Sequence, residues 1–266
     1  MIKLVATDID GTIFIPEKEF TVGVKDCIKR LSKSGIKVVL VTGRMNAAAT
    51  KIAKDLELDT PVVSYQGGLV VENGKKLYER YLTEEQTARV LEWASREKIH
   101  INLYNDDVLY SEKECYEVNR YCDNLHTEYT IKSFSDIVKN KINKLLAIDY
   151  SNPERISQYE KELQNVFPDL YIVKSTPYFL EFSNPEASKR CAVEFLQEFW
   201  GLKKEEILTI GDQNNDIALL QAGGLKIAMG NASEELKQIA DYITGSVYED
   251  GFVTAMEKFC FNTEQQ

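Results

Sequence analysis

The sequence predicts an α/β protein with a Rossmann-like parallel sheet core that is interrupted by an inserted α+β segment. Two observations support this fold class: short apolar runs alternate with helical patterns toward both ends of the chain, and this alternation is lost in the middle. Strands that alternate with helices are typical of βαβ units, whose strands lie parallel in one sheet. We expect the core to comprise residues 1–82 and 186–266, and the insert to comprise residues 83–185.

The first part of the core begins with an apolar run at residues 2–7, which predicts a buried strand. Residues 21–34 have helical spacing and Gly35 ends it, while the β-branched run at 36–41 predicts a second strand. The next expected elements are an Ala-rich helix at 46–57, a strand at 61–65 and a hairpin over 67–81 with an Asn-Gly turn.

The insert opens with a helix over 83–98 that Thr83 caps. From there to about residue 183 the patterns predict the order α, β, β, α, β, α, β, α, β, β. Asp106-Asp107 and Thr176-Pro177 have the composition of hairpin turns. The expected strands lie near 99–104, 107–111, 128–131, 141–149, 170–174 and 178–183.

The simple alternation returns after residue 186, which predicts that the chain rejoins the parallel sheet. The expected order is helix 187–199, strand 206–210, helix 214–221, strand 225–228, helix 233–240, strand 241–244 and a last helix near 253–260.

Composition excludes several classes of protein. The 266 residues are 44% hydrophobic and 28% charged, as in ordinary globular proteins. The net charge of −10 and the absence of a Lys/Arg block disfavour nucleic acid as a partner. Five scattered cysteines without a C-x-x-C motif fit a reducing cytoplasm. The short apolar N-terminus does not resemble a signal peptide. No apolar segment is long enough to span a membrane, so we expect no membrane partner.

The first cluster of reactive residues is Asp8-Ile9-Asp10-Gly11-Thr12, directly after the first predicted strand. Binding sites in parallel sheets form beyond the carboxyl ends of the strands. Two carboxylates at such an end can reach one bound ion or phosphate, and Gly11 lets the backbone turn away. The same Asp-x-Asp-Gly pattern opens calcium loops, but its strand-turn setting disfavours an EF-hand. The structural alternative is an acidic turn.

Three further clusters follow the same logic. Thr42-Gly43-Arg44 supplies a hydroxyl and a cation after the second strand, although a helix cap and a surface arginine are the simpler interpretation. Lys189 lies in the first turn of a predicted helix, where most lysines are solvated. Gly211-Asp212-Gln213-Asn214-Asn215-Asp216 follows another buried strand and places two carboxylates four residues apart. Together, these clusters indicate an anion and metal site.

The order Asp-x-Asp, Thr, Lys, Gly-Asp-x-x-Asn-Asp resembles the four motifs of haloacid dehalogenase-like hydrolases. The C-terminal Gly230-Asn231-Ala232 and Glu249-Asp250-Gly251 resemble the Cof-type branch of that superfamily, and the insert resembles its C2B cap. Two departures concern neighbours of the motifs: Gln66 stands where the family commonly has Asn, and Arg190 follows the motif lysine in place of Gly.

The resemblance implies a phosphatase that uses Mg²⁺. In this family the position of Asp8 is the nucleophile and that of Asp10 the general acid and base. Asp8, Asp212 and the backbone carbonyl of Asp10 would bind the metal, with Asp216 in or near its coordination shell. Lys189 would neutralise Asp8 and the transferring oxygens. The implied contacts to phosphate come from Thr42 and the backbone amides near Gly11 and Gly43. Asn215 contacts the phosphate or holds Lys189, and Arg44 binds substrate or forms a structural ion pair.

We therefore expect a cytoplasmic enzyme that hydrolyses small phosphate monoesters, such as sugar phosphates or phosphorylated cofactors, through an aspartyl-phosphate. A phosphomutase or other phosphotransferase would keep the same motifs. A phospho-ligand-binding regulator without activity would keep the fold. A Rossmann dehydrogenase is disfavoured because no G-x-G-x-x-G follows the first strand. We expect the insert to act as a cap that selects the leaving group.

Overall fold

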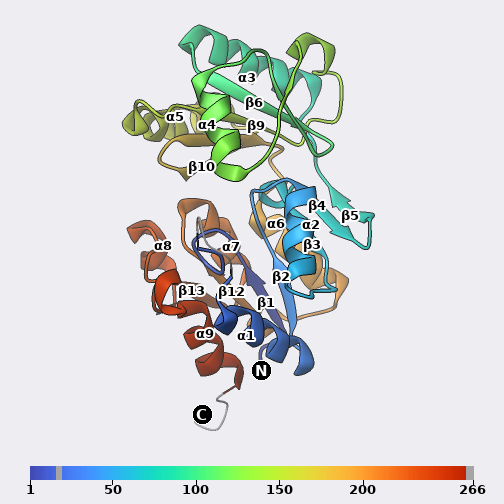
Figure 1. Cartoon of the computed structure of the whole chain (residues 1–266), viewed down its shortest axis with the longest axis vertical. Coiled ribbons are helices and arrows are strands. Elements are labelled where there is room, and N and C mark those ends of the chain that lie inside the picture. The colour runs from blue at the N-terminus through green and yellow to red at the C-terminus, as the bar shows by residue number, and fades with distance from the viewer. Residues whose placement is uncertain (16–19, 262–266) are drawn as a thin grey trace. The chain divides into compact units, whose positions relative to one another are not determined.

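The computed structural model describes residues 1–15 and 20–261, which form two compact units (Figure 1). The core unit contains Met1–Glu79 and Ser188–Gln266, and the inserted unit contains Arg80–Ala187. Each unit has its own sheet and its own hydrophobic core. The predicted fold class, an α/β core with an inserted α+β segment, is confirmed.

The core unit is built on a five-stranded parallel sheet with the order β14-β13-β12-β1-β2. Strand β1 lies between β12 and β2, so segments from the two ends of the chain alternate in one sheet. All four strand pairs are parallel, as the alternation of strands and helices predicts. The strands are β1 (Leu4–Thr7), β2 (Lys37–Leu40), β12 (Ile207–Gly211), β13 (Leu225–Ala228) and β14 (Tyr242–Ile243).

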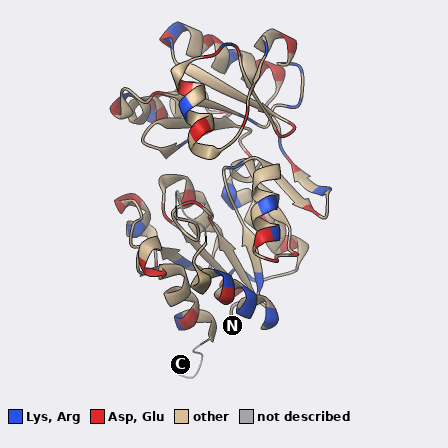
Figure 2. Cartoon of the chain, viewed as in Figure 1, with Lys and Arg blue, Asp and Glu red and all other residues tan. Residues whose placement is uncertain are grey.

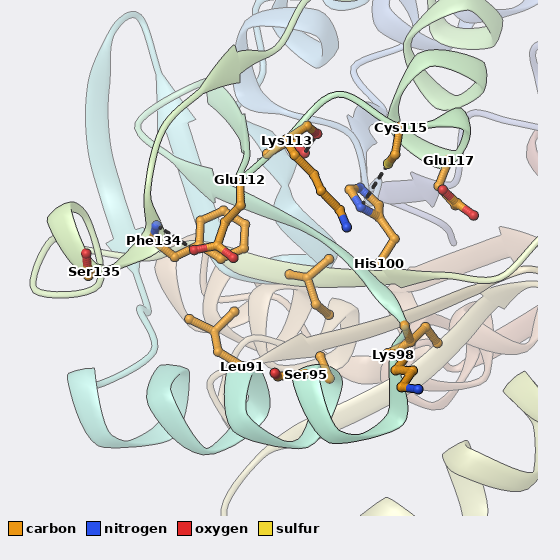
Figure 3. A pocket seen from close by; sticks show the side chains of 14 residues that line it. Leu91, Ser95, Lys98, His100, Glu112, Lys113, Cys115, Glu117, Phe134 and Ser135 are labelled. Carbon is orange, nitrogen blue, oxygen red and sulfur yellow. Dashed lines mark hydrogen bonds between the residues drawn. The ribbon is translucent and has the colours of Figure 1, made fainter.

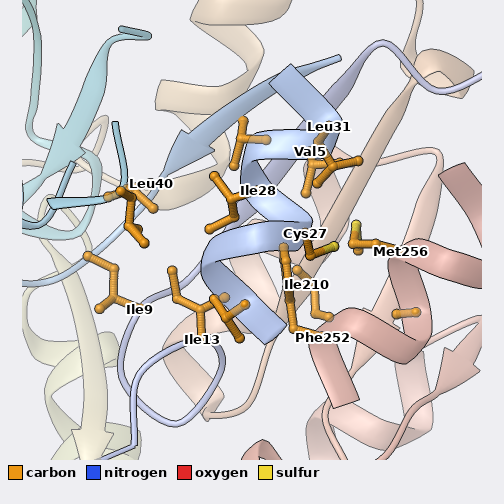
Figure 4. Close-up of a cluster of buried hydrophobic side chains, with 14 of the residues drawn as sticks. Val5, Ile9, Ile13, Cys27, Ile28, Leu31, Leu40, Ile210, Phe252 and Met256 are labelled. Carbon is orange, nitrogen blue, oxygen red and sulfur yellow. The ribbon is translucent and has the colours of Figure 1, made fainter. Parts of the chain in front are cut away.

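Helices bury both faces of this sheet, which explains why its strands are mostly apolar rather than strictly alternating. Successive side chains of a strand point to opposite faces, and accordingly Val5 packs into one cluster while Leu4 and Ala6 pack into another. Figure 4 shows the first cluster, in which Val5 and Ile28 gather with residues of the C-terminal helix. The helices are α1 (Val22–Lys33), α2 (Asn46–Asp55), α6 (Lys189–Phe199), α7 (Ile217–Ala222), α8 (Glu234–Ile239) and α9 (Gly251–Met256).

Local sequence accounts for where these helices begin. The Thr21 hydroxyl accepts a hydrogen bond from the Val24 amide at the start of α1, and Ser188 does the same for Cys191 at the start of α6. Two expected helices differ in detail. The segment 214–221 begins as a 3₁₀ turn before α7, and the last helix begins at Gly251 and continues as a π-helical turn.

The strand expected at 61–65 departs from the parallel pattern. β3 (Val62–Ser64) pairs antiparallel with β4 (Leu69–Glu72), which pairs antiparallel with β5 (Lys75–Glu79). A single parallel bridge between Val41 and Val63 joins this small sheet to the end of β2. The reason is a tight turn after β3, in which Tyr65, Gln66 and Gly67 all have positive φ, so the chain reverses at once.

The inserted unit has a six-stranded sheet with the order β10-β11-β9-β6-β7-β8, in which only β7 and β8 pair parallel. Three helices accompany it, and the capping box that starts α3 at Thr83 is the predicted one. Its elements are α3 (Glu84–Glu97), β6 (His100–Asn105), β7 (Val108–Ser111), α4 (Tyr116–Leu125), β8 (Thr130–Ile131), β9 (Lys144–Ile148), α5 (Pro153–Val166), β10 (Tyr171–Thr176) and β11 (Phe179–Ser183).

Two expectations for the insert are wrong. The helix expected between β8 and β9 is a single 3₁₀ turn at Phe134–Asp136, in a segment that packs Phe134 and Ile137 into the hydrophobic core of the insert. The hairpin turn expected at Thr176-Pro177 lies one residue later, at Pro177 and Tyr178, because Thr176 still pairs with Phe179.

Acidic and basic residues are interspersed along the helices of both units (Figure 2). In the described part of the chain, no helix is both long enough and apolar enough to cross a membrane.

Candidate active site

The candidate site lies at the carboxyl ends of the central parallel strands. Asp8 follows β1, Thr42 lies beyond β2 and Asp212 follows β12, and all three side chains are buried. The Asp8 amide donates to the Ile210 carbonyl, which continues the strand pairing past the end of β1. Residues separated by about 200 positions are therefore held together by the register of one sheet.

Three buried carboxylates meet at this edge. Asp8, Asp212 and Asp216 each offer an oxygen, and these atoms lie within 4.8 Å of one another. Gly11 permits this approach, since its φ is +80° and a Cβ there would lie 2.3 Å from Asp212 Oδ2. Clustered carboxylates are the donors that hard divalent cations prefer. The predicted metal residues Asp8, Asp212 and Asp216 thus form a group suited to a divalent cation.

Lys189 is the cation of this cluster. It is the first residue of α6 and is fully buried, and its Nζ lies 2.6 Å from both Asp8 Oδ1 and Asp216 Oδ1. Gly67 brings the start of α6 close to the turn after β3, because a Cβ at its φ of +104° would lie 2.1 Å from the Ser188 carbonyl oxygen. The pairing of Lys189 with Asp8 agrees with the neutralising role that the resemblance implies.

Asp216 is held in place by the backbone as well as by Lys189. Its Oδ2 accepts hydrogen bonds from the amides of Asp212 at 2.9 Å and Gln213 at 3.2 Å. Because both of its oxygens already bind groups of the chain, Asp216 orients Lys189 and the turn that carries Asp212. In contrast, no partner of Asp8 Oδ2 is found in the described part of the chain, which leaves that oxygen for other chemistry.

One ammonium does not balance three buried carboxylates. Burial raises the pKa of Asp8 well above its ordinary value, Asp216 raises it further, and Lys189 opposes both. Burial and Asp216 also raise the pKa of Asp212 to about 7. Burial alone would lower the pKa of Lys189, but Asp216 and Asp8 outweigh it and raise that pKa. The excess negative charge favours a bound divalent cation.

Asp10 and Arg44 form an ion pair beside the buried cluster. Arg44 Nε lies 2.8 Å from Asp10 Oδ2, and Arg44 Nη2 lies 2.5 Å from Asp10 Oδ1. Both side chains are part exposed, with 44% of the Asp10 side chain accessible, and the Arg44 guanidinium lies 5.4 Å from the Phe14 ring centroid. Of the two roles expected for Arg44, the structure shows an ion pair with Asp10.

Some of the groups expected to donate hydrogen bonds to phosphate already donate to other groups of the chain. Thr42 Oγ1 accepts a hydrogen bond from the Arg44 amide, which orients the hydroxyl so that its own proton can be donated elsewhere. The Gly11 amide donates to the Phe14 carbonyl at 2.9 Å. A direct contact from the Gly11 amide to phosphate is therefore disfavoured, because the turn after β1 already uses it. Gly43 lies beside Thr42 and is half-buried.

Asn215 does not hold Lys189, which was one of its two expected roles. Its Nδ2 donates to Gln66 Oε1 at 3.2 Å, while its Oδ1 is buried and has no hydrogen-bond partner. Gln66 is buried in the left-handed region with a φ of +58°. The residue at which the sequence departs from the family pattern thus directly contacts a motif residue.

Asn231 is a site residue to which sequence reasoning assigned no role. Its Nδ2 donates to the Gly11 carbonyl at 2.9 Å and to Asp212 Oδ2 at 3.4 Å, and its Oδ1 accepts from the Val247 amide. It therefore links the turn after β1 to the segment beyond β14. Its position after a strand, in the quoted Gly230-Asn231-Ala232, was the available signal. Gln213 and Thr12 were also missed, and each donates to the Asp212 carboxylate.

A family model described as haloacid dehalogenase-like hydrolase matches residues 5–256, nearly the whole chain. The chain is a haloacid dehalogenase-like hydrolase. Phosphoglycolate phosphatase 1 of Saccharolobus solfataricus is 33% identical to it over 248 residues, which are 92% of this chain and 90% of that protein. A solved haloacid dehalogenase-like hydrolase from Bacteroides thetaiotaomicron is 27% identical, with a TM-score of 0.83 over 97% of this chain and 99% of its own.

A solved subclass IIB sugar phosphatase of this superfamily shares the fold, with a TM-score of 0.85 over 97% of this chain and 98% of its own at 22% identity. The family model confirms the resemblance to haloacid dehalogenase-like hydrolases, and both solved structures share the fold over 97% of this chain, which includes the insert. The chain is accordingly an enzyme and belongs with the phosphatases of this superfamily. An EF-hand is excluded, since the Asp8 segment follows strand β1 rather than a helix.

Proposed function

We propose that this haloacid dehalogenase-like hydrolase is a Mg²⁺-dependent phosphatase that hydrolyses small phosphate monoesters through an aspartyl-phosphate on Asp8. The observation that carries the proposal is the buried arrangement of Asp8, Lys189, Asp212 and Asp216 at the ends of β1 and β12. A carboxylate held by an ammonium on one oxygen and unengaged on the other is suited to attack an anionic phosphorus centre.

In the first step, an Asp8 oxygen forms a bond to phosphorus while the bond from phosphorus to the ester oxygen breaks. Once Arg44 has moved to the substrate and Asp10 has taken up a proton, Asp10 gives that proton to the departing oxygen. In the second step, water attacks the aspartyl-phosphate, Asp10 takes a proton from that water, and inorganic phosphate leaves with Asp8 restored. Lys189 stays beside Asp8 throughout and offsets charge on the transferring oxygens.

Asp10 reaches the substrate only if its contact with Arg44 changes. We propose that Arg44 holds Asp10 in place between turnovers and transfers one of its donors to the substrate when the phosphate binds. The pair is part exposed, so such an exchange needs little desolvation. Thr42, already oriented by the Arg44 amide, donates its hydroxyl proton to a phosphoryl oxygen.

The three-carboxylate group fits Mg²⁺, because its donors are hard oxygens and its net charge is negative. Asp8 and Asp212 would hold the cation, with the Asp10 carbonyl as a further ligand. Asp216 would orient Lys189 and the turn that carries Asp212. When bound, Mg²⁺ supplies positive charge that offsets the repulsion between Asp8 and the phosphate.

We propose small metabolites as substrates, and therefore a cytoplasmic enzyme. The relative from S. solfataricus is named for phosphoglycolate, a small anionic monoester. The chain's net charge of −10 and its interspersed surface charges do not favour a polyanion such as nucleic acid.

The deciding experiment is a panel of phosphate monoesters, including sugar phosphates and phosphoglycolate, with inorganic phosphate as the product measured. We expect Mg²⁺-dependent release from the wild type and none from Asp8→Asn, with beryllium fluoride bound only by the wild type. Circular dichroism checks that the variant is folded. Transfer of phosphate to a sugar acceptor without release would instead identify a phosphotransferase, and equal rates in Asp8→Asn would refute the mechanism.

A further inference from the structure

The inserted unit contains a pocket that no step of the proposed phosphatase reaction uses. Its volume is about 620 Å³, and it is lined by α3, the start of β6 and the segment between β7 and α4 (Figure 3). Leu91 and Phe134 supply apolar walls, while Lys98, Glu112, Lys113 and Glu117 supply charges of both signs. Such a lining suits a small molecule that carries both ammonium and carboxylate groups.

One wall of the pocket carries a cysteine paired with a histidine. Cys115 Sγ lies 3.3 Å from His100 Nδ1, and Figure 3 shows the thiol pointing toward the imidazole ring. Both residues line the pocket, and Cys115 is half-buried. Among the described residues, no other cysteine forms a hydrogen bond with a histidine.

A third residue determines which nitrogen of His100 carries the proton. His100 Nε2 lies 2.7 Å from Asn102 Oδ1, and Asn102 is completely buried. The two residues are two apart on β6, so their side chains lie on the same face of the strand. With Asn102 Oδ1 as the acceptor, Nε2 carries the proton and the Nδ1 lone pair faces the thiol.

Both members of the pair are neutral at rest. Burial raises the pKa of the Cys115 thiol and Glu117 adds to this, although the backbone amide of Val118 opposes it. Burial also lowers the pKa of His100. The arrangement therefore provides a general base beside a nucleophile rather than a resting thiolate.

We propose that Cys115 is a thiol–disulfide exchange site for small disulfides of the amino-acid type, with His100 as its base. His100 Nδ1 takes the thiol proton as Cys115 Sγ attacks one sulfur of the disulfide. A new S–S bond to Cys115 forms, the original S–S bond breaks, and the departing thiolate takes the proton from His100. The disulfide itself is the oxidant, so no other redox partner is needed. Lys98, Lys113 and the acidic residues of the pocket bind its carboxylate and ammonium groups.

The test uses the full-length reduced protein and cystine as the probe. Samples are quenched with acid over time, and peptide mass spectrometry follows the mixed disulfide at each cysteine. Cys191 is the matched control, since it also lies at the start of a helix and is half-buried, but contacts the Ser188 hydroxyl rather than an imidazole. We expect Cys115 to react at least ten times faster than Cys191, and Cys115→Ser to remove the fast adduct.

Two variants separate base catalysis from simple accessibility. We expect His100→Ala to slow the reaction at Cys115 at least tenfold and added imidazole to restore part of the rate, which a packing role would not produce. His100→Gln keeps a polar partner for Asn102 and serves if His100→Ala does not fold. Equal rates at Cys115 and Cys191, or an unchanged rate at Cys115 without His100, would overturn the proposal. Phosphate release is measured in parallel and is expected to be independent of these substitutions.

Discussion

The Nζ of Lys189 lies 2.6 Å from Oδ1 of Asp8, although 180 residues separate them in the chain. The same ammonium bonds Asp216, and the side chain of Lys189 is completely buried. We predict that Lys189→Met lowers kcat by about 10²- to 10³-fold, as expected for loss of a preorganised donor. It should also lower the free energy of unfolding by about 3 kcal/mol, because it leaves buried carboxylates without their cation.

Steady-state kinetics and urea unfolding test this prediction, with the exposed Lys29→Met as the control, since Lys29 pairs with Glu57 at the surface. Loss of activity without loss of stability would show that Lys189 does not stabilise the folded protein.

Binding of Mg²⁺ should stabilise the protein measurably. The carboxylates of Asp8, Asp212 and Asp216 repel one another and are only partly offset by Lys189. At a Mg²⁺ concentration about 100 times the Kd, we expect a gain of about 2.7 kcal/mol in the free energy of unfolding. Thermal denaturation with Mg²⁺ and with chelator measures the effect. Asp212→Asn should abolish most of it, and an equal gain in that variant would argue against this metal site.

Arg44→Ala tests whether the pair with Asp10 serves catalysis. Both side chains are part exposed, so we expect the free energy of unfolding to change by less than about 1 kcal/mol. If Arg44 positions Asp10 and then binds phosphate, kcat/KM of Arg44→Ala should fall by about tenfold or more. Arg44→Lys should retain only part of the wild-type kcat/KM, because lysine cannot form the bidentate contact. Unchanged kcat/KM in both variants would leave Arg44 with a structural role only.

Gln66 and Asn215 should be energetically coupled. Replacing Gln66 by Met leaves the buried Asn215 Nδ2 without its acceptor, which we expect to lower the free energy of unfolding by about 1–3 kcal/mol. The double variant Gln66→Met/Asn215→Leu should lose less than the sum of the two single variants. Urea unfolding of the four proteins measures the coupling energy, and strict additivity would show that the contact adds nothing to stability.

Asp149 gives a prediction for pH. Its Oδ1 accepts hydrogen bonds from Ser151 and Asn152, and its Oδ2 pairs with Arg155. Burial alone would raise the pKa of Asp149, but these partners outweigh it and lower that pKa. The resulting stability is fully present above the unfolded pKa of about 3.9 and is lost as pH falls through the lower folded value.

We therefore expect Asp149→Ala to lower the free energy of unfolding by about 2 kcal/mol at pH 7, through the hydrogen bonds it removes. The difference from the wild type should be the same at pH 5.5 and should shrink below about pH 4. Urea unfolding at several pH values tests this, and a difference that grows toward acid would show that the sign is wrong.

Much of the secondary structure was predictable because it depends on local patterns. Short apolar runs identified β1, β2 and β12, and the Thr83 capping box identified the start of α3. The failures occurred where tertiary contacts override local preference. Between β8 and β9, Phe134 and Ile137 pack into the core of the insert from a 3₁₀ turn rather than from the expected helix.

The sequence by itself determined the fold class, because strand and helix periods are local properties of the chain. It also singled out Asp8, Thr42, Lys189 and Asp212, since each lies just beyond a predicted strand or at the start of a helix. Only the tertiary structure decided which of these side chains touch. Contacts between Lys189 and Asp216, Arg44 and Asp10, or Asn231 and Gly11 join distant segments through sheet register and helix packing, and no local pattern records them.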